Sequence, residues 1–137
     1  MTACTESKET GKVVEKSFGE RVAEAKAAVP AVSPQAARAR QESDSRVLFI
    51  DPRSAADIAA TTGLIPGALN VPLGTLNGNA ELPEAMASRS QPIVTACQAG
   101  PMGALAAHAL KQRGYTDVCY LDGGTQGWLN AGYATQR

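Results

Sequence analysis

The chain has 137 residues, of which 44% are hydrophobic, so it is long and apolar enough for one globular domain. Its 13 basic and 13 acidic residues cancel to a net charge of zero, which predicts neither a nucleic-acid partner nor an anionic membrane partner. No apolar stretch approaches the ~18–20 residues of a membrane span, and the polar segment Met1 to Phe18 lacks the apolar region of a secretory signal.

The N-terminal third of the chain predicts a mobile tail followed by one helix. Residues 1–16 are polar and charged and show no apolar periodicity, so we expect them to be mobile. Ser17 can cap a helix over about 18–29, and Glu20 completes a capping box. We expect residues 17–32, this helix and a linker, to dock on the core, with partner binding as the alternative. The helix has one narrow apolar face, formed by Phe18, Val22, Ala25 and Val29.

The remaining residues, 33–137, alternate strand and helix patterns and predict the main domain. This alternation is typical of βαβ units and a mainly parallel sheet. Turn-rich sequence at 63–68 separates the earlier patterns from the later ones. In order, the patterns predict a helix from Ser33-Pro34 to about Gln41, a strand at 47–50, a helix from Ser54 to about Ala60, a strand at 69–71, a loop at 73–81 and a short helix after Leu82.

The next segment places a cysteine between a strand and a helix. Residues 92–96 form a short uncharged run, as expected for a strand buried on both faces. After Cys97, Gly100 allows a positive φ and Pro101 suits the first position of a helix. The helix shows a core-facing stripe of Met102, Leu105, Ala106, Ala109 and Leu110, and Gly114 follows its end.

Cys97 is therefore the candidate nucleophile of this chain. Free N–H groups in the loop and the positive end of the following helix both favour a thiolate, and such settings can lower a thiol pKa from ~8.5 to ~3.5–7.5. The alternative is a buried structural cysteine, since free cysteines are often buried. A turn at the carboxyl end of a parallel strand is, however, where open α/β sheets bind their ligands.

The other two cysteines and the single histidine carry weaker signals. Cys4 lies in the tail, and Cys119 lies in a predicted core strand at 118–121, which precedes a Gly-Gly turn and a last helix that holds Trp128. Three cysteines fit reduced thiols in a cytoplasmic protein better than a disulfide framework. No metal-ligand spacing or phosphate loop is present, so we expect no metal and no cofactor. His108 lies ~9 Å along the helix from Met102, too far to act as a base for Cys97.

Five segments together resemble the rhodanese family over about residues 33–132. Asp51-Pro52-Arg53 follows the first core strand, where the family has Asp-x-Arg. The segment from Gly63 to Pro72 resembles the family pattern Gly-His-Ile-Pro-Gly-Ala-x-Asn-Val-Pro, with Leu64 in place of the histidine. The other matching segments are Pro92 to Cys97, Gly114-Tyr115, and Leu121-Asp122-Gly123-Gly124 with Trp128.

The resemblance implies a five-stranded, mainly parallel sheet with helices on both faces. It also implies a sulfurtransferase in which Cys97 carries sulfur as a persulfide, without a cofactor. Its partners would be a small sulfur donor and a thiol acceptor, which can be a thiol-carrying protein. Carried over from the family, the loop from Gln98 to Met102 forms the cradle for the sulfur. We expect the substrate-binding residues to be Gln98, Ala99, Gly100, Met102 and Gly103, with Asp51 and Arg53 at the carboxyl end of a strand near the pocket.

The loop departs from the family pattern in its charge. The family often has Arg, Lys or His here, whereas residues 98–104 hold none of these. A thiosulfate dianion would meet only amides and the helix end, so thiosulfate is expected to be a poor donor. A catalytically weak binding or sulfur-sensing module is the alternative function.

Phosphatase activity is a less favoured hypothesis for the function of this chain. Phosphatase-type relatives have a longer loop that ends in an Arg, whose fork embraces a phosphate, and Gly103 stands at the corresponding place. For Asp51 and Arg53 two interpretations stay open: they position substrate, or they form a structural ion pair at the strand end.

Overall fold

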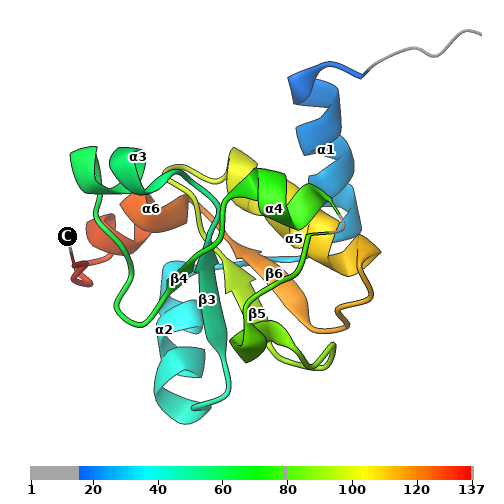
Figure 1. Cartoon of the computed structure of the whole chain (residues 1–137). Coiled ribbons are helices and arrows are strands. Elements are labelled where there is room, and N and C mark those ends of the chain that lie inside the picture. Colours follow the sequence, from blue (N-terminus) through cyan, green and yellow to red (C-terminus); the bar gives the residue numbers. More distant parts are fainter. Residues whose placement is uncertain (1–15, 79, 137) are drawn as a thin grey trace, which may run out of the picture.

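A computed structural model describes residues 16–78 and 80–136 of the chain. Its centre is one sheet of five parallel strands in the order β2-β6-β5-β3-β4, so the predicted α/β architecture is confirmed (Figure 1). The strands are β2 (Ala31–Val32), β3 (Leu48–Asp51), β4 (Leu69–Asn70), β5 (Ile93–Thr95) and β6 (Val118–Leu121). The helices are α1 (Phe18–Ala28), α2 (Pro34–Ser43), α3 (Ala55–Ala60), α4 (Leu73–Asn77), α5 (Pro101–Gln112) and α6 (Gly124–Asn130), with a 3-10 turn η1 (Glu84–Met86).

Strand β5 lies in the middle of the sheet. It pairs with β3 on one side, where Thr95 stands opposite Ile50, and with β6 on the other, where Thr95 stands opposite Tyr120. All three residues of β5 are buried, which explains why this strand is uncharged. Because the strands are parallel, their carboxyl ends meet at one edge of the sheet, and the residues after β5 emerge at the middle of that edge.

Side chains alternate between two hydrophobic clusters, one on each face of the sheet. In β3 and β6, Ile50 and Tyr120 belong to the cluster beneath α1, α4 and α5, whereas Phe49 and Leu121 belong to the cluster beneath α2 and α6 (Figure 1). Trp128 of α6 fills the second cluster, is 1% exposed, and donates its indole N–H to the carbonyl of Ala134. Trp128 therefore lies in the core with its one polar side-chain N–H group satisfied.

Helix α5 is buried more widely than its apolar stripe predicts. Gly103, Ala104 and Ala107 lie off that stripe and are buried too, while Met102, on the stripe, is half-buried. The reason is that α1 and α4 pack against α5, so the helix is covered on more than the sheet side.

In the part of the chain that the structure describes, no helix is long and apolar enough to cross a membrane.

The N-terminal helix α1 begins as predicted. The Ser17 hydroxyl accepts the N–H of Glu20 at 3.1 Å, and the Glu20 carboxylate accepts the N–H of Ser17 at 2.8 Å. Ala25 and Val29 are buried against the core, but Phe18 is 57% exposed, so the predicted apolar face is wrong at Phe18. The predicted tail lies outside the described residues except for Lys16, whose Nζ pairs with the carboxylate of Glu24 at 2.7 Å.

Two short elements differ from the sequence prediction. The predicted linker contains strand β2, whose Ala31 stands opposite Tyr120 at the edge of the sheet. The predicted loop at 73–81 contains α4, whose N-cap residue Pro72 makes no side-chain capping hydrogen bond. Strands of two residues and uncapped helices of five residues are too short to show a periodic pattern in the sequence. Such elements are stabilised by tertiary packing, which the local sequence does not show.

Candidate functional site

Cys97 lies at the middle of the carboxyl edge of the sheet, two residues after β5. The Gly100 N–H donates to the Cys97 sulfur at 2.9 Å, and the residue is 3% exposed. Gly100 has a φ of +127°, a conformation that glycine adopts readily, and Pro101 is the first residue of α5. The turn of the loop therefore directs a backbone donor at the sulfur.

The start of α5 supplies further donors beside this loop. The N–H groups of Met102 and Gly103 have no acceptor among residues 16–78 and 80–136, as is usual for the first turn of a helix. The positive end of the dipole of this 12-residue helix adds to their effect. A Cβ at position 103 would lie 3.4 Å from the backbone nitrogen of Cys97, so Gly103 lets the helix start close against the cysteine. The site can thus stabilise a negative charge on sulfur without a charged side chain.

The first turn of α6 holds the other side of the cysteine loop. The Thr125 N–H donates to the Cys97 carbonyl at 2.7 Å, and the Gln126 N–H donates to the Gln98 carbonyl at 2.9 Å. Gly123 and Gly124 have positive φ angles of 77° and 64°, as the predicted turn requires. Gly124 has a second role: a Cβ there would lie 2.7 Å from the carbonyl of Gln98, so only glycine allows this approach.

Thr125 was not found by sequence reasoning. Thr125 is fully buried, and in the described part of the chain its hydroxyl is the one buried side-chain polar group without a hydrogen-bond partner. By contrast, the buried hydroxyl of Thr95 donates to the carbonyl of Gly103 at 2.6 Å. The only sequence signal is a hydroxyl-bearing residue directly after the Gly-Gly turn.

Asp51 and Arg53 form the buried ion pair that was one of their two interpretations. Arg53 Nε donates to one carboxylate oxygen of Asp51 at 3.0 Å, and Nη2 donates to the other at 2.7 Å. The guanidinium also donates to the hydroxyls of Thr61 and Thr62 at 3.0 and 2.9 Å. Since Asp51 and Arg53 are only 2% and 4% exposed, these contacts hold the start of the 61–63 turn to the end of β3. A contact of Asp51 or Arg53 with substrate stays a prediction.

The predicted loop residues differ in how far they reach solvent. Gln98 and Ala99 are exposed, Met102 is half-buried, and Gly100 and Gly103 are buried. The exposed part of this loop therefore presents an amide and a methyl group, and no charge.

Cys119 and His108 lie in structural surroundings. Cys119 is buried in β6, and burial raises the pKa of its thiol, although Arg40 lies 3.9 Å from the sulfur and opposes this. His108 of α5 lines a cavity of about 140 Å³ together with Arg21 and Glu24 of α1. Neither residue is a partner of Cys97, in agreement with the sequence analysis.

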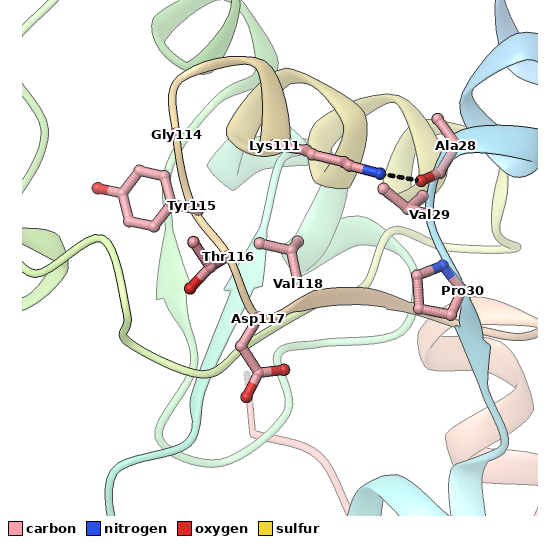
Figure 2. Close-up of a pocket in the computed structure, with 9 residues that line it drawn as sticks. All are labelled: Ala28, Val29, Pro30, Lys111, Gly114, Tyr115, Thr116, Asp117 and Val118. Carbon is pink, nitrogen blue, oxygen red and sulfur yellow. Dashed lines mark hydrogen bonds between the residues drawn. The ribbon is translucent and has the colours of Figure 1, made fainter.

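A larger cavity of about 520 Å³ lies at the opposite edge of the sheet (Figure 2). Its wall includes Asp117 and Val118 at the start of β6 and Pro30 just before β2. Figure 2 shows Lys111 at this site turned toward the end of α1, where its Nζ donates to the carbonyl of Ala28 at 2.7 Å. Pro30 and Asp117 come just before β2 and β6, whereas Cys97 comes just after β5. Because the strands are parallel, this cavity lies at the opposite edge of the sheet and is separate from the cysteine loop.

Comparisons with known proteins agree with this geometry. Among solved structures, a human single-domain sulfurtransferase is 30% identical, with a TM-score of 0.64 over 74% of this chain and 96% of that one. A polysulfide-sulfur transferase homodimer from Wolinella succinogenes is 22% identical, with a TM-score of 0.66 over 87% of this chain and 86% of that one.

A third structure carries a different description. It is a protein of unknown function from Rhodopseudomonas palustris, described as a possible tyrosine phosphatase, and it is 22% identical with a TM-score of 0.78. The alignment covers 91% of this chain and 98% of that one. At that identity the likeness concerns the fold alone.

A search of curated protein sequences found no match. The family model described as "Rhodanese-like domain" matches residues 33–131, from the cap of α2 through the end of α6. The chain therefore belongs to the rhodanese-like domain family.

Proposed function

We propose that this protein is a sulfurtransferase that carries sulfane sulfur on Cys97. One observation carries the proposal: the Cys97 sulfur lies at the start of α5 and accepts the Gly100 N–H. A thiolate is the nucleophilic form of cysteine, and both the donor and the helix dipole favour it over the neutral thiol.

In the first step, the Cys97 thiolate attacks the outer sulfur of a donor persulfide, R–S–SH. A bond forms between the two sulfurs, the S–S bond of the donor breaks, and its electrons leave with R–S⁻. Cys97 now carries the outer sulfur as Cys97–S–SH. The amides of Gly100, Met102 and Gly103 are available to stabilise negative charge on the sulfurs, in the manner of an oxyanion hole.

In the second step, an acceptor thiolate attacks the outer sulfur of the persulfide. The acceptor leaves as R′–S–SH, and the S–S electrons return to Cys97 as thiolate. The two steps are a sulfur exchange in which nothing is oxidised overall and no cofactor takes part.

The relatives support the reaction class. The human single-domain sulfurtransferase is 30% identical over 74% of this chain. A small sulfur donor and a thiol acceptor, which can be carried by a protein, are the partners that this chemistry uses. A cytoplasmic location suits it, because thiols stay reduced there, and the two cysteines in the described part of the chain are both free.

A binding or sulfur-sensing module is the second candidate. The observation that favours it is the uncharged loop that follows a cysteine only 3% exposed. Such a module would take up sulfur without passing it on at a useful rate. Phosphatase chemistry finds no support in the loop, because residues 98–104 contain no Arg to grip a phosphate.

The test is sulfur transfer from a thiol-derived persulfide to an acceptor thiol, followed as a rate. The wild type should turn over many times, and Cys97→Ser should fall to the uncatalysed rate, because a hydroxyl is a far weaker nucleophile at neutral pH. Cys119→Ser is the matched control and should retain activity. A single turnover that stops would favour the module, and equal rates for wild type and Cys97→Ser would contradict both candidates.

A further inference from the structure

We propose that the Thr125 hydroxyl donates a hydrogen bond to the outer sulfur of the Cys97 persulfide. This inference rests on the proposed function, and it names the residue that would recognise the loaded cysteine. Thr125 would then be a catalytic residue of the sulfur exchange, supplied by α6 rather than by the cysteine loop.

The first argument is the cost of the free hydroxyl. Thr125 is fully buried, and its Oγ1 has no partner among the described residues. A buried polar group without a partner destabilises the fold, so such groups are rare and call for an explanation. Thr62 and Thr95, the other buried threonines, both donate to carbonyl oxygens, at 2.7 and 2.6 Å.

The second argument is position. The N–H of Thr125 donates to the carbonyl of Cys97 at 2.7 Å, which fixes the backbone of Thr125 directly against the cysteine. The next residue, Gln126, repeats this contact with Gln98 at 2.9 Å, and Gly124 lies against Gln98 so closely that a Cβ would not fit. Two hydrogen bonds and one glycine contact therefore hold the threonine at a fixed place beside the loop.

The third argument is the length of a persulfide. The Thr125 hydroxyl makes no hydrogen bond to the thiol sulfur of Cys97. Among the described residues, that sulfur accepts its hydrogen bond from the Gly100 N–H. An added sulfur lies ~2 Å beyond the first one and so enters a region that the thiol does not occupy. A terminal persulfide sulfur is a hydrogen-bond acceptor, and it would give the hydroxyl the partner that the thiol form lacks.

The experiment measures the equilibrium of sulfur exchange between Cys97 and a small thiol persulfide, with occupancy read by intact-mass spectrometry. Thr125→Val keeps the shape and removes the hydroxyl, and Thr125→Ala removes it in case valine disturbs folding. Both variants should lower the exchange constant roughly ten- to a hundredfold, the effect of losing a hydrogen bond to a charged group. Thr125→Ser keeps a hydroxyl and should restore most of the wild-type constant.

A second readout separates this role from a structural one. In the wild type, loading with sulfur should raise the melting temperature, whereas in Thr125→Val it should not. A wild type that never takes up sulfur would overturn the proposed function and this inference together. A wild type that loads, with the same exchange constant and the same melting shift in both hydroxyl-free variants, would overturn this inference alone.

Discussion

Cys97 lies just after β5 and Cys119 lies in the neighbouring strand β6, and the two cysteines differ in their chemical surroundings. Cys97 follows β5 and accepts an N–H from Gly100 at the start of a helix. Cys119 lies inside β6 against the cluster around Trp128, where burial raises the pKa of its thiol. The residue type is the same, so the difference comes from where the fold places each sulfur.

A first prediction concerns alkylation by a small reagent such as iodoacetamide. Cys119 should react only as the pH rises above the ordinary thiol range of ~8.5, because burial raises the pKa of its thiol. At neutral pH Cys97 should react faster than Cys119, because the Gly100 N–H and the start of α5 lie at its sulfur and stabilise negative charge there. Comparing Cys97→Ser with Cys119→Ser, both with Cys4→Ser, assigns each rate. Equal alkylation rates for the two thiols at neutral pH would contradict this difference in reactivity.

A second prediction concerns the choice of sulfur donor. Thiosulfate is a dianion, and residues 98–104 offer it no positive side chain. Gln98 is exposed beside the site, so Gln98→Arg should raise kcat/KM for thiosulfate roughly ten- to a hundredfold, with a smaller gain for a neutral donor. Gln98→Glu is the matched control and should lower it. An unchanged preference in both variants would show that charge in this loop does not select the donor.

A third prediction concerns the ion pair between Asp51 and Arg53. Arg53→Met leaves a buried carboxylate without its partner, which should reduce the free energy of unfolding by about 3–5 kcal/mol. Urea denaturation measures this loss. The double variant Asp51→Asn with Arg53→Met should recover part of it, because no buried charge remains. If Arg53→Met instead keeps its stability and loses only kcat/KM, substrate binding becomes the better interpretation of Arg53.

At the scale of elements, capping signals in the sequence locate three helices well. Ser17, Ser33 and Ser54 each accept an N–H from the residue three positions on, and α1, α2 and α3 begin directly after them. Helix α4 has no such cap, and its sequence predicts a loop instead. Local hydrogen bonds can be predicted from neighbouring residues, whereas α4 depends on its contact with α5, which is distant in the sequence.

A fourth prediction concerns α1, which packs against α5. Removing residues 1–16 should leave the melting temperature unchanged, and removing residues 1–29 should lower it, because Ala25 and Val29 are buried in the core. Burial of the Val29 side chain alone contributes roughly 1.5–3 kcal/mol.

Two substitutions within α1 sharpen this test. Phe18→Ser should change stability by less than about 0.5 kcal/mol, since Phe18 is 57% exposed. Ala25→Leu should destabilise by about 1–3 kcal/mol, because a larger side chain does not fit a residue with no exposed surface. Equal melting temperatures for both truncations would show that α1 does not stabilise the domain.

At the scale of the whole molecule, the parallel sheet gathers the site at one edge. The ends of β3 and β5 and the turn after β6 bring together Asp51, Cys97 and Thr125, which are far apart in the sequence. Strand–helix alternation and the position of Cys97 predict this edge. Two features of the site cannot be predicted from the sequence. One is the buried Thr125 hydroxyl without a partner among the described residues, and the other is the pair of hydrogen bonds from Arg53 to the hydroxyls of Thr61 and Thr62. Each depends on burial and on partners that only the folded chain defines.

The central claim is that Cys97 carries sulfur, and intact-mass spectrometry of the whole chain tests it most directly. After incubation with a thiol-derived persulfide and removal of excess donor, the wild type should gain the mass of one sulfur atom. Addition of an acceptor thiol should remove that mass and place the sulfur on the acceptor. Cys97→Ser should gain nothing, and Cys119→Ser should behave as the wild type. A Cys97→Ser protein that gains and transfers sulfur as the wild type does would contradict the claim.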